Sequence, residues 1–218
     1  MARNPKSQVG LRGPVEHDIR NQIIAAATEH FRQYGYSKTT MTDLAGAIGF
    51  SKAYIYKFFA SKRAIGDVIS SYAIDQIAAS ADANIDAVAS ASDKIRQLFR
   101  SVTRSSLRLL REDRRLYDIV TQAVVENWSC NRLLDDRIEE KLRAIILTAR
   151  ASGEFERKTP LDEACRAIAG SLRAYTHPLM LAQDPDGAAK TEDEVIGMVL
   201  RSLAEASPRS VIGNGPLL

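Results

Sequence analysis

Apolar residues recur along this chain at spacings of three and four, the period of helices that bury one face. Between Glu16 and Tyr34 they occupy positions 19, 23, 27, 31 and 34. The same period returns after Ser61 toward Ala83, and then over residues 93–151, 162–182 and 191–206. Strand-type alternation and internal repeats are absent from the sequence. The pattern predicts an all-α protein.

Two short helices joined by a tight turn are predicted between residues 40 and 59. Thr40 precedes Asp43 by three positions, the spacing of a capping box that begins a helix. Gly49 ends that helix, because glycine adopts a positive φ at little steric cost. Ser51 is an N-cap for the next helix, Lys52 to about Phe59. This arrangement is a helix-turn-helix.

The second of these helices is predicted to show an aromatic and basic face to solvent. If Ile55 and Phe59 face the core, the outward residues are Lys52, Ala53, Tyr54, Tyr56 and Lys57. Lys62, behind the cap Ser61, begins the following helix. Cations at helix starts oppose the helix dipole, so an external anion such as a DNA phosphate would explain them.

Net charge is divided unevenly along the chain, which carries 30 Lys or Arg and 27 Asp or Glu in all. Residues 1–63 hold ten basic and four acidic residues, giving +6, whereas residues 64–218 hold twenty and twenty-three, giving −3. The basic excess therefore coincides with the helix-turn-helix, which favours nucleic-acid binding.

The run from Thr39 to Ile65 resembles the DNA-binding signature of the TetR-type (TetR/AcrR) bacterial transcriptional regulators. The matching residues are Thr40, Leu44, Ala45, Gly49, Ser51, Ile55, Tyr56, Phe59, Lys62 and Ile65. With the preceding helix, the resemblance covers roughly residues 16 to 70. Ala53, Tyr54 and Phe58 depart from the usual residues of the signature, which affects the expected base contacts and leaves the fold in place.

The resemblance implies an N-terminal three-helix DNA-binding domain and a C-terminal helical domain for ligand binding and dimerisation. The expected divisions are an arm over 1–15, the DNA-binding domain over 16–62, the helical domain over 63–206 and a flexible tail over 207–218. The arm is either inert or contacts phosphates or the minor groove through Arg3, Lys6 and Arg12.

A double-stranded DNA operator is the expected partner, with the second short helix in its major groove. Lys57 donates to a guanine or a phosphate in this prediction, and Tyr54 contacts a thymine methyl. Thr40, Tyr56 and Lys62 hold phosphates, as their counterparts do in the family. The complete predicted DNA-binding set is Thr40, Ser51, Lys52, Ala53, Tyr54, Tyr56, Lys57 and Lys62.

A homodimer is also expected, because operators read by such proteins are usually two-fold and the family pairs its last two long helices. Here these helices are Asp162–Ala182 and Thr191–Ala206. A surface of small residues would allow close approach: Ala167, Ile168, Gly170, Ser171 and Ala174. The alternative is that these stripes complete the monomer core.

The middle helices are predicted to enclose a mainly apolar pocket for a small apolar or aromatic effector. The predicted ligand-binding residues are Phe99, Tyr117, Val120, Val124, Trp128, Tyr175 and His177, with Leu107 and Met180 nearby. The effector would release the protein, a repressor, from its operator through the long helix that begins after Ser61. A regulator without a ligand, whose C-terminal helices only dimerise or bind a protein, is the alternative.

An enzyme is not predicted, because no arrangement of catalytic residues stands out. His17, His30 and His177 are scattered, and neither an HExxH nor a CxxC motif occurs. No metal or cofactor is expected, and Cys130 and Cys165 read as reduced, buried thiols. No apolar run is long enough to span a membrane, so the protein is expected to be cytoplasmic.

Overall fold

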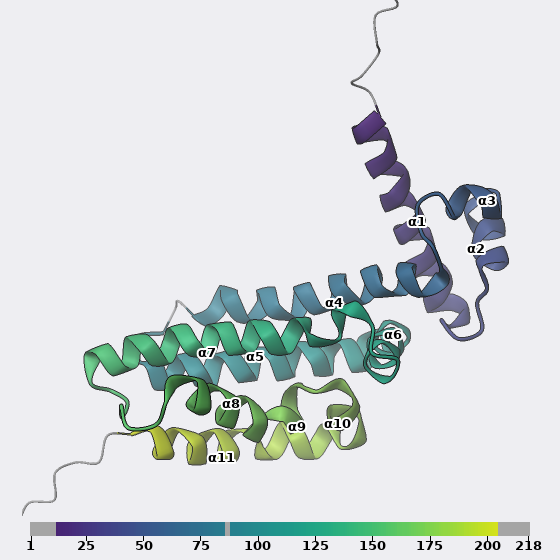
Figure 1. Cartoon of the computed structure of the whole chain (residues 1–218). Helices are drawn as coiled ribbons and strands as arrows, with labels where there is room; N and C mark the ends of the chain where they lie inside the picture. Colours follow the sequence, from purple (N-terminus) through teal and green to yellow (C-terminus); the bar gives the residue numbers. More distant parts are fainter. Residues whose placement is uncertain (1–11, 86–87, 205–218) are drawn as a thin grey trace, which may run out of the picture.

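The computed structural model of the chain describes residues 12–85 and 88–204 (Figure 1). Helices make up nearly all of the regular structure in these ranges, apart from one isolated β-bridge between Phe155 and Ala204. The prediction of an all-α fold is confirmed. In chain order the elements are α1 (Arg12–Tyr34), α2 (Met41–Ile48), α3 (Lys52–Ile55), α4 (Lys62–Ile85), α5 (Ala91–Glu112), α6 (Arg114–Val125), the 3-10 helix η1 (Ser129–Arg132), α7 (Leu133–Ser152), α8 (Leu161–Ser171), α9 (Arg173–Thr176), α10 (Pro178–Gln183) and α11 (Pro185–Leu203).

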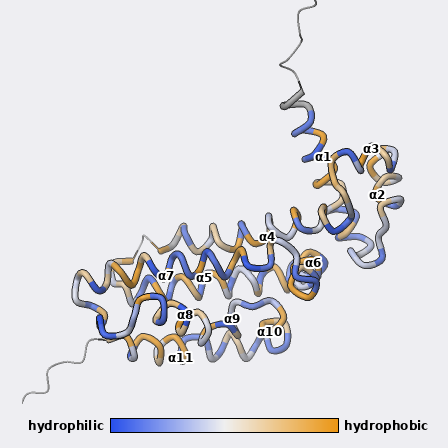
Figure 2. Tube along the Cα trace, in the orientation of Figure 1, coloured by the Kyte–Doolittle hydropathy of each residue, from blue (hydrophilic) through white to orange (hydrophobic). Residues whose placement is uncertain are grey.

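The molecule has two parts that α4 joins (Figure 1). Helices α1 to α3 form a small N-terminal unit at one end. Helix α4 leaves this unit and runs along a bundle, where it packs against α5, α6 and α7, while α8 to α11 cover another side of the bundle. Orange segments recur along the long helices of the bundle in Figure 2, which is the periodicity expected of one-sided burial.

Large apolar side chains are buried in the N-terminal unit. Ile23 and Phe31 of α1 are fully buried, as are Leu44 of α2 and Ile55 of α3. Phe59, just after α3, completes this core, so the prediction that Ile55 and Phe59 face the core is confirmed. Burying several large side chains in so small a unit fixes the angle at which α2 and α3 are presented to solvent.

The start of the first helix differs from expectation. Helix α1 begins at Arg12, so residues 12–15 of the predicted arm are helical; Pro14 is tolerated there because the first turn needs no N–H from it. The rest of the arm and the whole of the tail over 207–218 lie outside the described residues.

The prediction of one helix over 162–182 is wrong, because α8, α9 and α10 replace it. Pro178 cannot continue a helix, and His177 before it is extended at φ −80° and ψ 123°. The last helix starts at Pro185 rather than Thr191, because the Asp184 side chain accepts a hydrogen bond from Gly187 N at 2.9 Å and caps it.

Tyr72 of α4 is 63% exposed. Beyond position 70, the face that α4 buries carries Ala73, Ile74 and Ile77, and Tyr72 lies outside it. No helix within the described ranges combines the length and the apolar character needed to cross a membrane.

Candidate nucleic-acid interface and effector site

Local hydrogen bonds shape the start of α2 and the turn between α2 and α3 as the sequence indicates. The backbone N–H of Thr40 donates to Asp43 Oδ2 at 2.8 Å, and the Asp43 N–H donates to Thr40 Oγ1 at 3.2 Å. The bond from the Thr40 backbone is the main cause that lowers the pKa of Asp43. Gly49 has φ 76° and ψ 21°, and Ser51 Oγ accepts from Tyr54 N at 3.1 Å. The capping box, the glycine turn and the second cap are all confirmed.

Helix α3 is shorter than predicted, ending at Ile55 instead of about Phe59. The next turn tightens, because Lys57 N donates to Tyr54 O at 3.1 Å and Phe58 N donates to Ile55 O at 3.0 Å. The backbone nevertheless stays wound through residue 59, where Phe59 N donates to Ile55 O at 3.1 Å. The segment therefore still presents one face to solvent.

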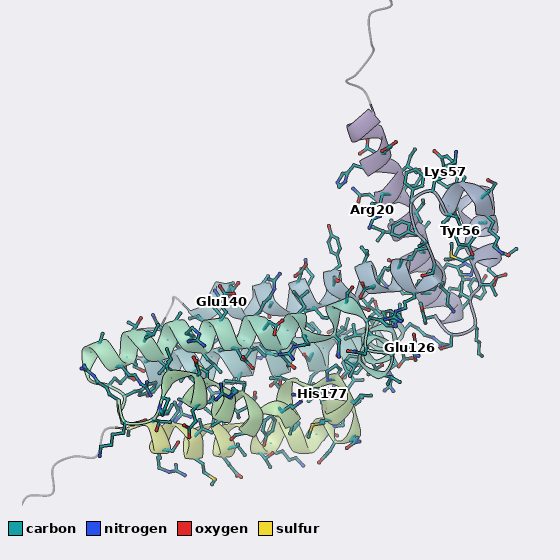
Figure 3. The ribbon with its side chains drawn as sticks, viewed as in Figure 1. Arg20, Tyr56, Lys57, Glu126, Glu140 and His177 are labelled. Atoms are coloured by element: carbon teal, nitrogen blue, oxygen red, sulfur yellow. The ribbon has the colours of Figure 1, made fainter. Side chains whose placement is uncertain are left out.

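That face carries Lys52, Ala53, Tyr56 and Lys57, all of which are exposed. Neither lysine forms an ion pair within the part of the chain that the structure describes. Figure 3 shows Tyr56 and Lys57 on the N-terminal unit, apart from the bundle. Two unpaired cations and a phenol thus project from the same short segment, where a large partner can reach them.

Tyr54 is only half-buried, and its ring lies between two phenylalanines. The centroids of Phe50 and Phe58 are 5.1 and 5.4 Å from that of Tyr54, both in edge-on geometry. The ammonium of Lys57 lies 5.5 Å from the Tyr54 centroid. These contacts restrict the ring and orient Lys57 beside it.

Arg20 of α1 supports this segment from behind, a role that the sequence pattern did not indicate. Its guanidinium donates to Phe58 O at 3.1 Å and stacks 4.3 Å from the centroid of Phe59 (Figure 3). No spacing rule links positions 20 and 58, so this contact emerges only in the folded unit.

Lys62 occupies a different environment from the one predicted for a phosphate ligand. Its ammonium donates to the carbonyl oxygens of Tyr36 at 2.9 Å and Thr39 at 2.8 Å, and it lies 4.3 Å over the Tyr36 ring. Burial lowers the pKa of this ammonium. Since two of its three N–H groups are used inside the protein, Lys62 mainly ties α4 to the loop between α1 and α2.

Four of the predicted effector residues lie together around a small cavity in the bundle. Tyr117, Val120 and Val124 of α6 and His177 before α10 line it, and its volume is about 30 Å³. The Tyr117 hydroxyl donates to Pro178 O at 2.7 Å. His177 Nδ1 is buried without a hydrogen-bond partner in the described structure, and burial lowers the pKa of the imidazole.

The other three predicted effector residues lie elsewhere. Phe99 is fully buried in the core, and Tyr175 is held by a 3.0 Å hydrogen bond to Thr191. Trp128 packs 5.3 Å from the Tyr36 ring and donates to Glu126 at 2.8 Å. Trp128 therefore belongs to the joint between the bundle and the N-terminal unit, because the path of the loop after α6 carries it there.

A capped helix-turn-helix with an exposed basic face, mounted on a helical bundle, defines the class of DNA-binding transcriptional regulators. Residues 23–67 match the family model described as bacterial regulatory proteins of the tetR family. Residues 91–196 match the model of the tetracyclin repressor-like C-terminal domain. The chain belongs to the TetR family.

Solved structures show the same fold. One is the TetR family regulator PfmR from Thermus thermophilus, with 28% identity, a TM-score of 0.53, and coverage of 82% of this chain and 97% of that one. A TetR/AcrR family regulator from Thermobifida fusca shares 26% identity over 86% of this chain and 100% of that chain, with a TM-score of 0.60.

FadR from Bacillus subtilis, solved in complex with stearoyl-CoA, shares 23% identity over 84% and 98% of the two chains, with a TM-score of 0.59. A search of curated proteins found no match. Among the described residues, no group of three or more His, Cys, Asp or Glu side chains is placed to hold a metal ion.

Proposed function

We propose that this protein is a transcriptional repressor. It binds a two-fold DNA operator, and a small ligand releases it from that operator. The observation that supports DNA binding is the outward face formed by α3 and the turn after it. Lys52, Tyr56 and Lys57 are exposed there, and neither lysine has an ion-pair or side-chain hydrogen-bond partner within the described residues. A helix of this width fits the major groove, and phosphates would complete the coordination of the cations. Action on the chromosome also implies a cytoplasmic protein.

The proposal gives these residues different roles. Lys57 and Tyr54 contact base edges in this proposal, while Tyr56, Lys52 and the Thr40 hydroxyl contact phosphates. Ala53 is exposed and small, so it lets the backbone approach the groove. Ser51 acts through its cap of α3, whereas Lys62 acts mainly by holding the loop between α1 and α2 against α4.

The experiment begins by selecting a duplex from a random library with the wild-type protein. Gel shifts on that duplex then compare wild type with Lys57→Ala and with Tyr56→Ala and Lys57→Ala combined. A base contact by Lys57 predicts a loss of about 1 to 3 kcal/mol in binding free energy. Arg157→Ala, an exposed cation of the bundle, is the matched control. Unchanged affinity of the double variant refutes the assignment.

A homodimer is part of the proposal, because one short recognition helix gives limited specificity. Ala167, Gly170, Ser171 and Ala174 are exposed, which leaves the small-residue surface open for a second copy; Ile168 alone of the predicted set is buried. Met198 on α11 is 63% exposed. Sedimentation of wild type should show a dimer. Gly170→Arg should dissociate this dimer, whereas the control Ala151→Arg, on α7, should leave it intact. A wild-type monomer at micromolar concentration would refute the dimer.

The effector proposal rests on the cavity beside Tyr117, Val120, Val124 and His177. About 30 Å³ holds little more than one water molecule, so a ligand binds only if the bundle opens around it. His177 Nδ1, without a partner, offers a hydrogen-bonding group to such a ligand. Opening would displace α6, and the resulting preference for one state would weaken DNA binding.

The small cavity also favours a second candidate, a regulator that needs no ligand and whose bundle only dimerises or binds a protein. The two candidates differ in one screen, in which compounds are tested for thermal stabilisation and each hit for operator release. Apolar hits that release the operator support the first candidate. Hits that leave operator affinity unchanged support the second and leave the DNA-binding proposal intact.

A further inference from the structure

A groove lies between α5 and α11, outside both the helix-turn-helix and the small cavity. Its volume is about 440 Å³, within the usual range of small-molecule sites. Arg100, Arg104, Arg108 and Arg111 line it at intervals of four, four and three along α5. These intervals place the four guanidiniums on one face of the helix, so the groove has a basic wall.

Two of the four arginines are already engaged across the groove. Arg100 binds both carboxylate oxygens of Asp193 at 2.6 and 2.8 Å, and Arg111 donates to Asp186 at 2.9 Å. These ion pairs hold α5 and α11 together. They therefore fix the width of the groove.

The two central arginines are different. Arg104 and Arg108 are exposed, and neither has an ion-pair or hydrogen-bond partner within residues 12–85 and 88–204. One helical turn separates them, so their side chains start about 5 to 6 Å apart. Two planar guanidiniums at this spacing suit two neighbouring phosphate groups, each of which can accept two parallel hydrogen bonds.

The acidic residues that line the groove form no ion pair with Arg104 or Arg108 in the described structure. Glu192 is buried on the floor, where the Thr103 hydroxyl lies 2.5 Å from its Oε1 and 3.1 Å from the carbonyl oxygen of Tyr175. Burial raises the pKa of Glu192. The exposed carboxylates of the groove are Asp193, which is paired with Arg100, and Glu112.

We infer that this groove binds a small molecule that carries a diphosphate, such as a nucleoside diphosphate. Arg104 and Arg108 bind the two phosphates, and the apolar side chains of Leu107 and Ala189 receive the attached ring system. DNA is a poorer fit, because the groove belongs to the bundle and α3 lies on the other part of the molecule (Figure 1). The inference goes beyond the proposed function and does not depend on it.

Calorimetry on the full chain tests the site with inorganic pyrophosphate and with ADP. We expect both to bind wild type, and Arg104→Gln with Arg108→Gln to weaken them by roughly tenfold or more. Arg157→Gln with Lys158→Gln removes the same charge from an exposed turn and should bind like wild type. If the double glutamine variant fails to fold by circular dichroism, Arg108→Lys replaces it, since this variant keeps the charge and loses bidentate geometry.

Four results would overturn the inference. The first is that pyrophosphate and ADP do not bind wild type at millimolar concentration, and the second is that they bind the Arg104 and Arg108 variant equally well. The third is that binding is lost only in Lys52→Gln with Lys57→Gln. The fourth is that the arginine substitutions dissociate the dimer. The last would show that the arginines meet a second copy. Operator binding without nucleotide should be unchanged in the arginine variant, so this test fails or succeeds independently of the DNA-binding proposal.

Discussion

Substituting Lys62 by methionine separates a structural role from a DNA-contacting one. Methionine keeps much of the aliphatic stem that packs over Tyr36 but removes the ammonium, which leaves the carbonyl oxygens of Tyr36 and Thr39 without their donor. A hydrogen bond from a charged donor contributes about 1.5 to 3 kcal/mol. Because Lys62 is only partly buried, water replaces some of this loss, and we expect the two bonds together to contribute about 1.5 to 3 kcal/mol.

For a chain of this size, such a loss lowers the melting temperature by roughly 3 to 12 °C. The assay is thermal and urea unfolding of wild type, Lys62→Met and Lys38→Met. Lys38 is an exposed lysine of the same loop without a partner in the described structure, so its variant should unfold like wild type.

A gel-shift series in rising salt provides the second readout. Removing one phosphate interaction from each protomer of a dimer lowers the salt slope by about 2, whereas removing an internal tie leaves the slope nearly unchanged. We expect the nearly unchanged slope. Unaltered stability together with a slope lower by about 2 would refute the structural role and restore Lys62 to the phosphate-binding residues.

Further substitutions test the packing of two glycines, the cap of α2 and the burial of Glu192. Gly66→Ala brings a Cβ within 2.8 Å of the Trp128 ring and should lower the unfolding free energy by about 1 to 3 kcal/mol. Gly46→Ala adds a Cβ with nothing within 4 Å and should raise the unfolding free energy by about 0.5 to 1 kcal/mol. Effects of the same sign would contradict the packing argument. Thr40→Ala removes the capping box and should cost about 0.5 to 2 kcal/mol in urea unfolding, and no loss would contradict the cap's role. The raised pKa of Glu192 contributes stability that is present below its usual pKa of 4.5 and is lost as the pH rises through the pKa of the folded state. Glu192→Gln should therefore have the melting temperature of wild type near pH 4 and a higher one at pH 8. A difference in melting temperature that does not depend on pH would contradict the raised pKa.

Short-range sequence patterns predicted both ends of α2 and the start of α3 correctly. The pairing of Thr40 with Asp43, the positive φ of Gly49 and the cap by Ser51 all involve residues within three positions of each other, so spacing alone predicts them. Gly153 ends α7 at φ 81° for the same reason. The exposed face of α3 followed directly, because two buried residues fix the rotation of so short a helix.

Contacts between distant segments were not predictable. Lys62 meets carbonyl groups 23 and 26 positions earlier, and no pattern in the sequence shows that the loop before α2 folds onto the start of α4. Trp128 was assigned to the pocket because it is aromatic and follows an apolar stripe, yet the turn after α6 directs it to Tyr36. The size of the cavity was equally hidden, since close packing depends on every side chain around it.

These distant contacts converge on Tyr36, which leads to a final prediction. The Lys62 ammonium donates to the carbonyl oxygen of Tyr36, and the Trp128 ring packs against the Tyr36 ring. A Cβ added at Gly66 would lie 2.8 Å from the Trp128 ring. Lys62→Met and Gly66→Ala therefore both disturb the packing around Tyr36. Neighbouring substitutions that share a partner are not additive, and the second should cost less once the first has freed the loop. We expect the double variant to lose less unfolding free energy than the two single losses together, by about 0.5 kcal/mol or more. Urea unfolding of all four proteins measures this, with Gly46→Ala in place of Gly66→Ala as the additive control; strict additivity of Lys62→Met with Gly66→Ala would show that Tyr36 does not link the bundle to the helix-turn-helix.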